Sequence, residues 1–536
     1  MSVTRPAAVV VLAAGEGTRM KSATPKVLHE ICGRSLVGHV VSAARALDPE
    51  QLVVVVGHAR EKVTAHLAQL DPGIRTAVQY EQNGTGHAVR MALEELGGDG
   101  PAGTVLVTCG DTPLLTGETL QQLADTHVAD GNAVTVLTAE VPDATGYGRI
   151  VREGGRGEGG GAVTAIVEHK DASEEQRAIR EINSGVFAFD GRLLAQALGK
   201  VRTDNSQGEE YLTDVLGILR EGGHRVGAAV AGDHREIAGI NNRVQLAEAR
   251  RMLNGRLVEE AMLAGVTVVD PATTWMDVGV TYEPDAMVHP GTQLLGGTHL
   301  GEDSEVGPNT RLTDTVVGAG ATVSNTVAQG ARIGAGASVG PYTYLRPGTR
   351  LGPKVKAGSY VEMKNAEIGE GTKVPHLSYV GDAVIGEHSN IGAASVFVNY
   401  DGESKHTTTV GSHCRMGADN MYVAPVTVGD GAYSAAGSVI TKDVPPGSLA
   451  VARGQQRNIE GWVARKRPGS ASAQAAQTAQ AAQAEESVQP GQSARTEGSA
   501  QSGQSAGGAV PGAASDGAET ARSANGTGGQ VPAEEG

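Results

Sequence analysis

A six-residue repeat in the second half of the chain constrains the fold more than any other feature of the sequence. In each unit an aliphatic residue is followed by glycine or another small residue, as in IGEGTK (368–373), IGEHSN (385–390) and VGDGAY (428–433). Two uninterrupted runs of aliphatic positions are Val288, Leu294, Leu300, Val306 and Leu312, and then Ile333, Val339, Leu345 and Leu351. A period of six does not fit an α-helix, but it is typical of a parallel β-helix in which each hexapeptide forms one side of a coil. We expect the aliphatic side chains to point inward and the glycines to turn the corners.

The repeat is interrupted once, at FVNYDGESKHTTT (397–409). We expect an extra loop to leave the coil at this point. Because insertions in repeat proteins commonly lie on the functional face, this loop predicts a functional site nearby.

The first part of the chain alternates hydrophobic strands with helical stretches. Segments rich in Val, Leu and Ile at 8–15, 52–57, 104–111 and 133–141 favour buried strands. Continuous apolar strands separated by helices predict a Rossmann-like α/β domain with a mostly parallel sheet. Ligands of such sheets bind beyond the carboxyl ends of the strands, which is where Gly15 and Asp111 lie.

Shifts in composition divide the chain into four parts. Residues 1–243 form the α/β domain, 244–264 one connecting helix that ends near Gly265, and 265–467 the hexapeptide domain. Residues 468–536 are mainly Ala, Gln, Ser, Gly and Pro, without Leu, Ile or aromatic residues. Such a segment cannot bury enough apolar surface to order itself, so we expect a disordered tail.

Charge and cysteine usage argue against several classes of protein. The formal net charge of −16 disfavours nucleic-acid binding, which needs a basic face. Cys32, Cys109 and Cys414 form no CxxC pair, so neither a disulfide framework nor a zinc site is expected. The apolar run near the N-terminus favours a buried strand over a signal peptide, and no stretch approaches the length of a membrane span. We therefore expect a cytoplasmic protein without a nucleic-acid or membrane partner.

The segment LAAGEGTRMKSATPK (12–26), which begins in the first expected strand, favours phosphate binding. It is not a Walker loop, because the Gly-Lys-Ser/Thr order is absent, and it lacks the third glycine of the dinucleotide fingerprint. A glycine turn after a strand still presents backbone N–H groups to an anion, and Arg19 and Lys26 add two cations. An ordinary turn with solvated basic residues is the alternative interpretation.

The motif LxxGxGTRM followed by PK resembles the opening motif of the sugar nucleotidyltransferases. With the hexapeptide array, the chain up to about residue 467 resembles the bacterial family of bifunctional N-acetylglucosamine-1-phosphate uridylyltransferases and glucosamine-1-phosphate N-acetyltransferases. Further matching stretches, in order, are QNGTGHA (82–88), CGDTPLL (109–115), GYGRI (146–150), IVEHKDA (166–172), EINSG (181–185) and GINNR (239–243).

The resemblance implies a homotrimeric enzyme whose hexapeptide domain is a left-handed parallel β-helix. This enzyme would acetylate glucosamine 1-phosphate with acetyl-CoA. It would then transfer a uridylyl group from UTP to N-acetylglucosamine 1-phosphate and release pyrophosphate. The product, UDP-N-acetylglucosamine, would supply peptidoglycan and other cell-envelope precursors.

The resemblance also assigns roles in the α/β domain. Lys26 and Arg19 would neutralise charge on the transferred phosphorus and the leaving pyrophosphate, and Asp111 and Asn241 would ligate Mg²⁺. The residues expected to bind the UDP-sugar are Leu12, Ala13, Ala14, Gly15, Lys26, Gln79, Gly84, Thr85, Gly148, Glu168, Asn183 and Asn241. Considered alone, Asp111 would be interpreted as a helix N-cap, and Glu168 and Asn183 as surface residues.

In the hexapeptide domain the resemblance assigns His376 as the general base. An imidazole titrates near neutral pH, so it is suited to take a proton from a sugar amine that attacks a thioester. The residues expected to bind the sugar phosphate are Arg346, Lys364, Tyr379 and Asn390. Those expected to contact acetyl-CoA are Ala393, Asn399, Tyr400, Ala418, Ala436 and Arg453. Without the resemblance, His376 would be an exposed corner histidine, and Arg346 and Lys364 part of a solvated face.

The sequence departs from the family pattern at several points. Residues 153–161 predict a longer, Gly-rich hairpin, and Ser184 stands where Thr is common. Ala418 stands where we expect a serine that helps to hold CoA, which puts that contact in doubt. None of these departures removes a residue with a proposed catalytic role.

Two other functions remain open. The β-helix could be only an oligomerisation or regulatory platform, which a measurement of acetyl-CoA consumption would decide. The chain could also be a non-catalytic assembly or exchange-factor subunit. Such a protein could lose Lys26, Asp111 or Asn241, and the presence of all three disfavours this alternative.

Overall fold

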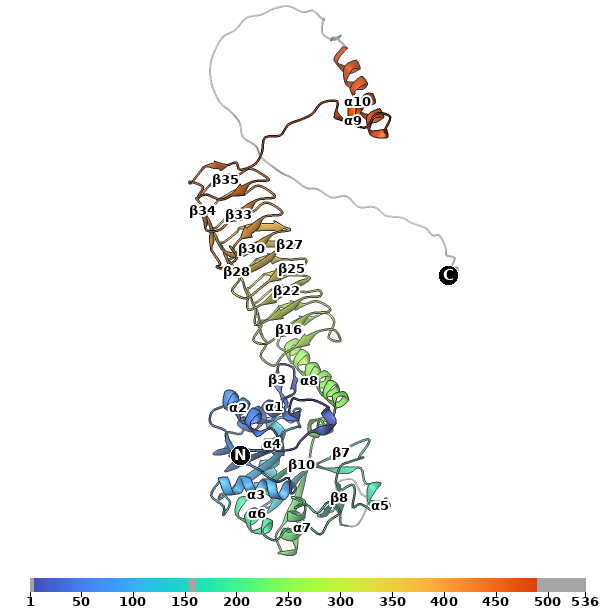
Figure 1. Ribbon diagram of the computed structural model, residues 1–536. Helices are drawn as coiled ribbons and strands as arrows, with labels where there is room; N and C mark the ends of the chain where they lie inside the picture. Colours follow the sequence, from blue (N-terminus) through green and yellow to red (C-terminus); the bar gives the residue numbers. More distant parts are fainter. Residues whose placement is uncertain (1–3, 154–160, 489–536) are drawn as a thin grey trace, which may run out of the picture. The chain divides into compact units, whose positions relative to one another are not determined.

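Residues 4–153 and 161–488 are described by the computed structural model, in which the chain separates into two compact units between Gly454 and Gln455. The first unit begins with an α/β domain built on one nine-stranded sheet. The strands of this sheet are β1 (Ala8–Ala13), β4 (Gln51–Val56), β5 (Arg75–Val78), β6 (Thr104–Cys109), β7 (Val134–Glu140), β8 (Arg149–Arg152), β9 (Val163–Val167), β10 (Glu181–Asp190) and β11 (Val226–Val230). Their order is β11–β7–β10–β6–β1–β4–β5, with the hairpin β8–β9 joined to β10 (Figure 1).

Helices cover both faces of this sheet. The helices of the domain are α1 (Leu36–Arg45), α2 (Arg60–Leu70), α3 (Thr85–Glu95), α4 (Gly117–Ala129), α5 (Glu174–Arg177), α6 (Gly191–Leu198) and α7 (Asp214–Glu221). Val9 and Val11 of β1 pack into a core shared with α1 and α4, whereas Ala8 and Val10 pack into a core shared with α3, α6 and α7. Alternate residues of a strand point to opposite faces, so a strand covered on both sides is apolar throughout. The four strands expected from the sequence correspond to β1, β4, β6 and β7.

The sheet is mixed rather than wholly parallel. β1 pairs in parallel with β4 and β6, whereas β10 runs antiparallel to both β6 and β7. The strands β8 and β9 form an antiparallel hairpin that flanks the Gly-rich segment, of which residues 154–160 lie outside the described part of the chain. Buried parallel and antiparallel strands are equally apolar, which is why the sequence did not predict these reversals.

A single long helix, α8 (Arg243–Leu263), follows the α/β domain. Asn242 caps it, because the side chain accepts hydrogen bonds from the N–H groups of Val244 and Gln245. Gly265, with φ +101°, ends it in the left-handed region that glycine adopts without strain. The expected connecting helix is therefore present at its predicted position.

Stacked coils of short parallel strands form the remainder of the first unit (Figure 1). One side of the coils comprises β12 (Thr267–Val268), β15 (Met287–Val288), β18 (Glu305–Val306), β21 (Thr322–Val323), β24 (Ser338–Val339), β27 (Lys356–Ser359) and β29 (Lys373–His376), followed by β35 (Tyr433–Ser434) and β37 (Leu449–Ala450). The other two sides comprise β13 (Trp275–Met276), β14 (Thr281–Tyr282), β16 (Gln293–Leu295), β17 (His299–Leu300), β19 (Arg311–Thr313), β20 (Val316–Val317), β22 (Thr326–Gln329), β23 (Arg332–Ile333), β25 (Thr343–Leu345), β26 (Arg350–Leu351), β28 (Glu362–Ile368), β30 (Tyr379–Ile385), β31 (Val396–Val398), β32 (Thr408–Val410), β33 (Met421–Val423), β34 (Val426–Val428) and β36 (Val439–Ile440). This curled parallel arrangement is consistent with the predicted left-handed β-helix.

The aliphatic residue of each hexapeptide points into the coil, as predicted. Val288, Leu294, Leu300, Val306 and Leu312 are all fully buried, with 0% of their surface exposed. They belong to one continuous core that extends from Val258 of α8 to Val444. The core consists mostly of aliphatic side chains, with Phe397 and Tyr422 as its buried aromatic members, which agrees with the low aromatic content of the sequence.

The repeated glycines have two roles, of which only the turning of corners was expected. Gly318 and Gly334, which directly follow the buried aliphatic residue, do not turn the corner in a left-handed conformation. Instead, a Cβ atom at either position would lie 2.7 Å or less from the backbone of the next coil. The corners are formed two residues later, at Gly320 and Gly336, where φ is +63°. Close stacking of the coils therefore requires glycine at positions 318 and 334, whereas Gly307 and Gly340, which also follow a buried aliphatic residue, have positive φ.

The predicted insertion leaves the coil between the end of β31 at Val398 and the start of β32 at Thr408. Within it, Tyr400 and Lys405 form an antiparallel bridge, so the loop folds back on itself. The loop is attached to β30, since β30 pairs with both β31 and β32.

The second unit, described by itself, contains α9 (Trp462–Lys466) and α10 (Ala471–Val488). The helix α10 lies in the segment that we expected to be disordered, and the rest of that segment, from 489, lies outside the described residues. Alanine and glutamine have high helix propensity, so a local helix can form without burying a core. Throughout the described part of the chain, no helix combines the length and hydropathy needed to cross a bilayer.

Candidate active sites

A cavity of about 310 Å³ lies at the carboxyl ends of β1 and β6. It is lined by Leu12, Ala13, Ala14, Gly15, Lys26, Val27, Gln79, Gln82, Gly84, Thr85, Ala88, Cys109, Asp111 and Glu209. Eight of the twelve residues expected to bind the UDP-sugar therefore meet at one cavity. The position agrees with the rule that open α/β sheets bind ligands beyond the carboxyl ends of their strands.

The loop after β1 is shaped to bring Lys26 to this cavity. The loop contains two short helical turns, η1 (Thr18–Met20) and η2 (Lys26–Leu28). Gly17 has φ +68°, and a Cβ atom there would lie only 2.5 Å from Cβ of Lys26. Both the backbone conformation and the contact with Lys26 thus require glycine at position 17.

The opposite wall is formed by the segment that leads into α3. The amide of Gln79 donates a hydrogen bond to the Gly84 carbonyl at 3.0 Å, and that of Gln82 donates to the Ala14 carbonyl at 3.0 Å. Gly84 has φ +103°, and a Cβ atom would lie 2.5 Å from the carbonyl oxygen of Glu210. Since α3 begins at Thr85, its N-terminal backbone borders the cavity, where it favours an anionic ligand.

Lys26 contacts two of the other residues predicted to act in catalysis or metal binding. Its ammonium group forms an ion pair with Asp111 and donates to Asn241 Oδ1 at 3.4 Å. Arg19 donates to the same Asn241 oxygen at 2.9 Å. Asp111 and Asn241 come from segments far apart in the sequence, yet their oxygen atoms face one cation.

This donor set fits a magnesium ion. Carboxylate and amide oxygens are ligands that Mg²⁺ accepts, and the ion commonly takes one or two protein oxygens together with substrate phosphates. Among residues 4–153 and 161–488, no group of three or more His, Cys, Asp or Glu side chains could hold a metal. A metal at Asp111 and Asn241 would therefore take the rest of its coordination from phosphate oxygens and water.

The predicted sugar-binding residues Gly148, Glu168 and Asn183 lie together beside the cavity. A Cβ atom at Gly148 would lie 3.4 Å from both Asn183 Cβ and Glu168 Oε1. Burial raises the pKa of Glu168, and the nearby charge of Asp171 raises it further. A Cβ atom at Gly185, two residues after Asn183 in β10, would lie 3.2 Å from Sγ of Cys109, so β10 brings the group next to the cavity.

Sequence analysis missed two residues that border Asp111. Cys109 lines the cavity, and burial raises the pKa of its thiol to about 12, with Asp111 adding to the effect. Burial also raises the pKa of Tyr147, and the charge of Asp111 again contributes. Both groups therefore remain protonated at neutral pH. Each belongs to a motif quoted above, CGDTPLL (109–115) or GYGRI (146–150), and this membership was the available signal.

A second polar cluster lies on the β-helix, where β28 pairs with β30. Asp382 accepts hydrogen bonds from Asn365, at 2.8 Å, and from Asn399, and it lies 4.0 Å from the Lys364 ammonium. Although burial opposes ionisation, these hydrogen bonds and Lys364 lower the pKa of Asp382 below its ordinary value. Two predicted site residues, Lys364 and Asn399, thus lie at this carboxylate, and Asn399 also lies 3.5 Å from the hydroxyl of a third, Tyr379.

Lys405, in the insertion loop, joins this cluster and was not predicted. A hydrogen bond and charge repulsion from Lys364 lower its pKa, with a smaller contribution from burial. Asp382 acts in the opposite direction but does not cancel the effect. Two lysines that repel each other beside one carboxylate form a position suited to a dianion such as a sugar phosphate.

Arg346 lies next to this cluster but has its own partner. Its guanidinium donates to Glu362 at 2.9 Å, and this hydrogen bond raises the pKa of Arg346. Glu362 is paired in register with Tyr379 on the neighbouring strand. The predicted sugar-phosphate residues Arg346, Lys364 and Tyr379 are thus brought to one side of the coils.

His376 and Asn390 lie across a corner from these residues. The corner is at Leu377, with φ +51°, so His376 ends one side of the coil and Tyr379 begins the next. Asn390 bridges to Lys373 and Arg415 and borders a separate cavity of about 280 Å³ with them. The side chain of His376 is exposed beside this corner.

Three of the residues predicted to contact acetyl-CoA, Ala393, Ala418 and Ala436, form a line along consecutive coils. The Asp419 N–H donates to the Ala393 carbonyl at 2.7 Å, and the Gly437 N–H donates to the Ala418 carbonyl at 2.9 Å. Ala393, Ala418 and Ala436 therefore occupy equivalent positions, each directly before a corner residue with positive φ. The Arg453 side chain lies beside Gly437, and Tyr400 is exposed in the insertion loop.

Comparison with known proteins agrees with both halves of this arrangement. Residues 9–179 match the family described as the MobA-like NTP transferase domain. The chain is 82% identical over 479 residues to the bifunctional protein GlmU of Streptomyces avermitilis, covering 89% of this chain and 98% of that protein. The chain belongs to the GlmU family.

Other GlmU proteins show that the likeness is not confined to one genus. The GlmU protein of Streptomyces coelicolor is 80% identical over 477 residues, covering 89% of this chain and 98% of the relative. That of Thermobifida fusca is 62% identical over 488 residues, covering 91% of this chain and 100% of the relative. The family and fold class predicted from the sequence are confirmed, as is the classification of the chain as a bifunctional transferase. The roles of individual GlmU site residues remain predictions.

Proposed function

We propose that the chain carries out two successive reactions that produce UDP-N-acetylglucosamine. The β-helix transfers an acetyl group from acetyl-CoA to glucosamine 1-phosphate. The α/β domain then transfers a uridylyl group from UTP to N-acetylglucosamine 1-phosphate. The observation that carries the proposal is the presence of two separate polar sites, one on each domain, in a chain that belongs to the GlmU family.

In uridylyl transfer, the cavity at the ends of β1 and β6 receives UTP. A phosphate oxygen of the sugar phosphate attacks the α-phosphorus, the new P–O bond forms, and the bond to the β-phosphate breaks to release pyrophosphate. Lys26 and Arg19 offset the negative charge that develops on the transferred phosphorus and the leaving group. Gly148, Glu168 and Asn183 orient the acetylated sugar.

Asp111 and Asn241 are the residues that would hold Mg²⁺ in this site. When bound, the ion would polarise the phosphate oxygens and neutralise part of their charge. Lys26, which contacts both side chains, would then turn from these oxygens towards the phosphates.

In acetyl transfer, the amine of glucosamine 1-phosphate attacks the thioester carbonyl. His376 accepts the proton that the amine loses, the new C–N bond forms, and the C–S bond breaks as CoA leaves and takes up a proton. Lys364, Lys405 and Arg346 hold the sugar phosphate, and Tyr379, Asn390 and Asn399 orient the sugar and the acetyl group. The line formed by Ala393, Ala418 and Ala436 gives CoA a smooth path, with Tyr400 and Arg453 at its sides.

A homotrimer explains why the acetyl-transfer residues are divided by a corner. The Lys364 cluster lies on one side of the coil, and Asn390 lies on another. The corner between them exposes Tyr342, Tyr360 and Leu377, whose exposed fractions are 58%, 60% and 61%. A second copy packed on this apolar ridge would place residues of two chains around one substrate.

The remaining partners are small molecules. The free thiols of Cys32, Cys109 and Cys414 and the use of UTP and acetyl-CoA support a cytoplasmic location. The net charge of −16 supports the absence of a nucleic-acid partner. The product supplies peptidoglycan and other cell-envelope precursors.

A split assay on one purified sample tests both reactions. Glucosamine 1-phosphate and acetyl-CoA are supplied first, and the free thiol of CoA is measured over time. UTP and Mg²⁺ are then added, and pyrophosphate is measured. Thiol release followed by pyrophosphate release supports the proposal. If pyrophosphate forms only from supplied N-acetylglucosamine 1-phosphate, the β-helix is a platform rather than an acetyltransferase, and Ala418 is the first substitution to revert to serine.

A further inference from the structure

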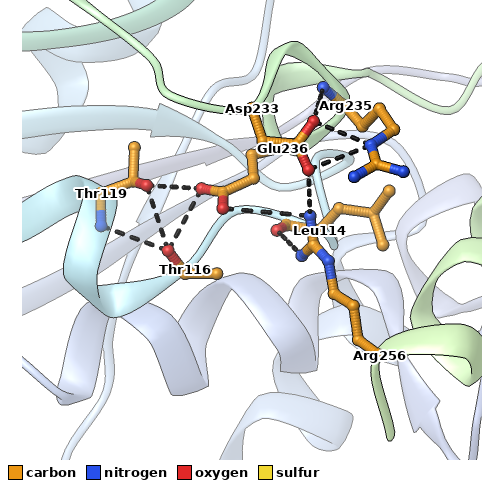
Figure 2. Close-up of polar contacts among 7 residues, drawn as sticks. All are labelled: Leu114, Thr116, Thr119, Asp233, Arg235, Glu236 and Arg256. Carbon is orange, nitrogen blue, oxygen red and sulfur yellow. Dashed lines mark hydrogen bonds and ion pairs between the residues drawn. The ribbon is translucent and has the colours of Figure 1, made fainter. Parts of the chain in front are cut away.

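A network around Arg256, in the second half of α8, ties the helix to the α/β domain (Figure 2). Arg256 donates one hydrogen bond to the Leu114 carbonyl at 2.8 Å and another to Asp233 at 3.2 Å. The same guanidinium lies 3.9 Å from Glu236. One arginine therefore joins three points: α8, the loop after β6, and the turn η3 (His234–Ile237).

The other members of the network hold that turn in place. Glu236 accepts hydrogen bonds from the hydroxyls of Thr116, at 3.1 Å, and Thr119, at 2.5 Å, in the first turn of α4. Asp233 also accepts from the Arg235 side chain at 2.8 Å (Figure 2). Without Arg256, Asp233 would keep its hydrogen bond from Arg235, and Glu236 would keep those from Thr116 and Thr119. The removal of Arg256 is therefore compatible with folding.

The two segments that Arg256 joins carry the two predicted metal ligands. Leu114 lies three residues after Asp111, and the turn η3 ends at Ile237, four residues before Asn241. The segments also meet directly, because the Ile240 N–H donates to the Asp111 carbonyl at 2.9 Å. Leu114 and Ile240, each only 1% exposed, share a small core with Met20 and Leu246. Arg256 thus connects the same two segments a second time, through Leu114 and Asp233.

The N-terminal turns of α8 make two further contacts with the site. Gln245 accepts a hydrogen bond from the Asn241 N–H at 2.8 Å. Arg243 donates to the carbonyl of Met20, the residue after Arg19, at 3.3 Å. The helix therefore contacts the segments that carry Arg19, Asn241 and Asp111, which is more than a connection between domains requires.

We propose that Arg256 is a positioning residue for uridylyl transfer, which fixes the separation of the Asp111 and Asn241 oxygens by holding the Leu114 carbonyl against Asp233. The proposal rests on the proposed uridylyl-transfer function. Under this proposal α8, which lies outside the α/β domain, contributes to metal binding. Groups that orient metal ligands commonly change metal affinity or activity when they are replaced.

The test compares Arg256→Ala with the wild-type full chain. The concentration of Mg²⁺ that gives half-maximal uridylyl transfer should rise by roughly ten-fold or more. Direct binding of Mn²⁺ in the presence of UTP, measured by electron paramagnetic resonance without turnover, should weaken by a similar factor. Acetyl transfer by the same sample should stay within about two-fold of wild type, because it uses the other domain.

The matched control is Arg251→Ala, which removes an exposed arginine from the same helix. It should leave the Mg²⁺ requirement, the Mn²⁺ affinity and acetyl transfer unchanged. Unchanged Mg²⁺ and Mn²⁺ affinities in Arg256→Ala would overturn the proposal, even if its melting temperature falls. An equal change in the Arg251→Ala control would also overturn it.

Two milder variants cover the case in which Arg256→Ala does not fold. Arg256→Lys keeps the charge but has a single nitrogen, which cannot bond Leu114 and Asp233 in the geometry of the guanidinium fork. Asp233→Asn is isosteric and weakens the same connection. Both should weaken Mn²⁺ binding in a folded protein, and wild-type Mn²⁺ affinity in both would overturn the proposal. Failure of wild type itself to release pyrophosphate would instead defeat the proposed function.

Discussion

At the scale of single residues, the position of Lys26 depends on a glycine nine residues before it. Gly17 has φ +68°, and the Lys26 side chain passes so close that a Cβ atom at position 17 would lie 2.5 Å from Cβ of Lys26. This contact directs the ammonium group to Asp111 and Asn241. A residue without a side chain is therefore part of what positions the Lys26 ammonium group.

Gly17→Ala should displace Lys26 and lower uridylyl transfer by roughly ten-fold to a hundred-fold, since misplacement by about 1 Å can cost that much. Acetyl transfer should be unchanged, because the β-helix is not affected. Gly217→Ala in α7 is the control, as its φ is not positive and nothing lies within 4 Å of an added Cβ atom. Steady-state kinetics of both reactions on each variant measure the effect. Uridylyl transfer at the wild-type rate in Gly17→Ala would show that Lys26 is placed by other contacts.

The lysine pair on the β-helix gives a prediction about pH. Because Lys364 lowers the pKa of Lys405, the Lys405 amine should be neutral at a lower pH than an ordinary lysine. At pH 9 it should therefore react faster with acetic anhydride than the exposed Lys442, as measured by mass spectrometry of the labelled peptides. Lys364→Met should raise the pKa again and slow the labelling. Glucosamine 1-phosphate should also slow it, because a bound dianion favours the charged amine.

Labelling of Lys405 that is no faster than that of Lys442 would contradict the repulsion between the two lysines. Labelling that is fast but unaffected by glucosamine 1-phosphate would leave the lysine pair intact and place the sugar phosphate elsewhere. The two outcomes thus separate the electrostatics of the cluster from its role in binding.

The site residues that could be predicted and those that could not differ in a simple physical way. Residues 12–15, Lys26 and Gly84 belong to contiguous motifs, and the structure places all of them at one cavity. Asp382 and Lys405 join the polar cluster around Lys364 through contacts between different coils. The sequence gives no distances between coils, so it did not predict these two residues. The role of such residues emerges only when the fold brings their segments together.

At the scale of elements, the β-helix shows how one sequence pattern can serve two geometric needs. The buried aliphatic residues confirm the inward positions of the hexapeptide. Gly318 and Gly334, which follow two of these residues, are needed because the next coil is too near for a side chain, whereas the corner lies two residues later. A period alone fixes neither which residue turns nor which residue must be small, so the fold was predictable but this detail was not.

Gly334→Ala should destabilise the β-helix, because its Cβ atom would lie 2.5 Å from the backbone of Gly352. Overpacking of this kind typically costs about 1–3 kcal/mol of unfolding free energy. Gly297→Ala is the control, since the nearest atom would be 3.8 Å away and its φ is not positive. Denaturant unfolding of both variants measures the difference. Equal stability of the two variants would mean that adjacent coils can separate at little cost.

Two elements escaped prediction for opposite reasons. The antiparallel direction of β10 depends on its pairing with β6 and β7, which its apolar sequence does not encode. The helix α10 depends only on local propensity, and a composition argument based on burial overlooks it. The pattern of hydrophobic residues therefore predicts neither the direction in which a strand pairs nor a helix that forms by local propensity alone.

At the scale of the whole molecule, the two proposed sites use different residues on different domains. The proposed uridylyl site lies at the end of a sheet and includes Asp111, whereas the proposed acetyl-transfer site lies on the coils and includes His376. No described residue is assigned to both. N-acetylglucosamine 1-phosphate, the product of the proposed acetyl transfer, is a small, soluble sugar phosphate. It can therefore reach the uridylyl site by diffusion.

A mixture of two single-site variants should therefore restore the complete pathway. Asp111→Ala should lose uridylyl transfer by about a hundred-fold or more and keep acetyl transfer, because it removes the charged metal ligand. His376→Ala should do the reverse, since a general base contributes about 10²–10⁴-fold. From glucosamine 1-phosphate, acetyl-CoA, UTP and Mg²⁺, neither variant alone should form appreciable UDP-N-acetylglucosamine. Together they should form it after a lag, during which N-acetylglucosamine 1-phosphate accumulates in solution. A mixture that fails, although each variant is folded and keeps its remaining activity, would mean that the intermediate passes between sites without being released.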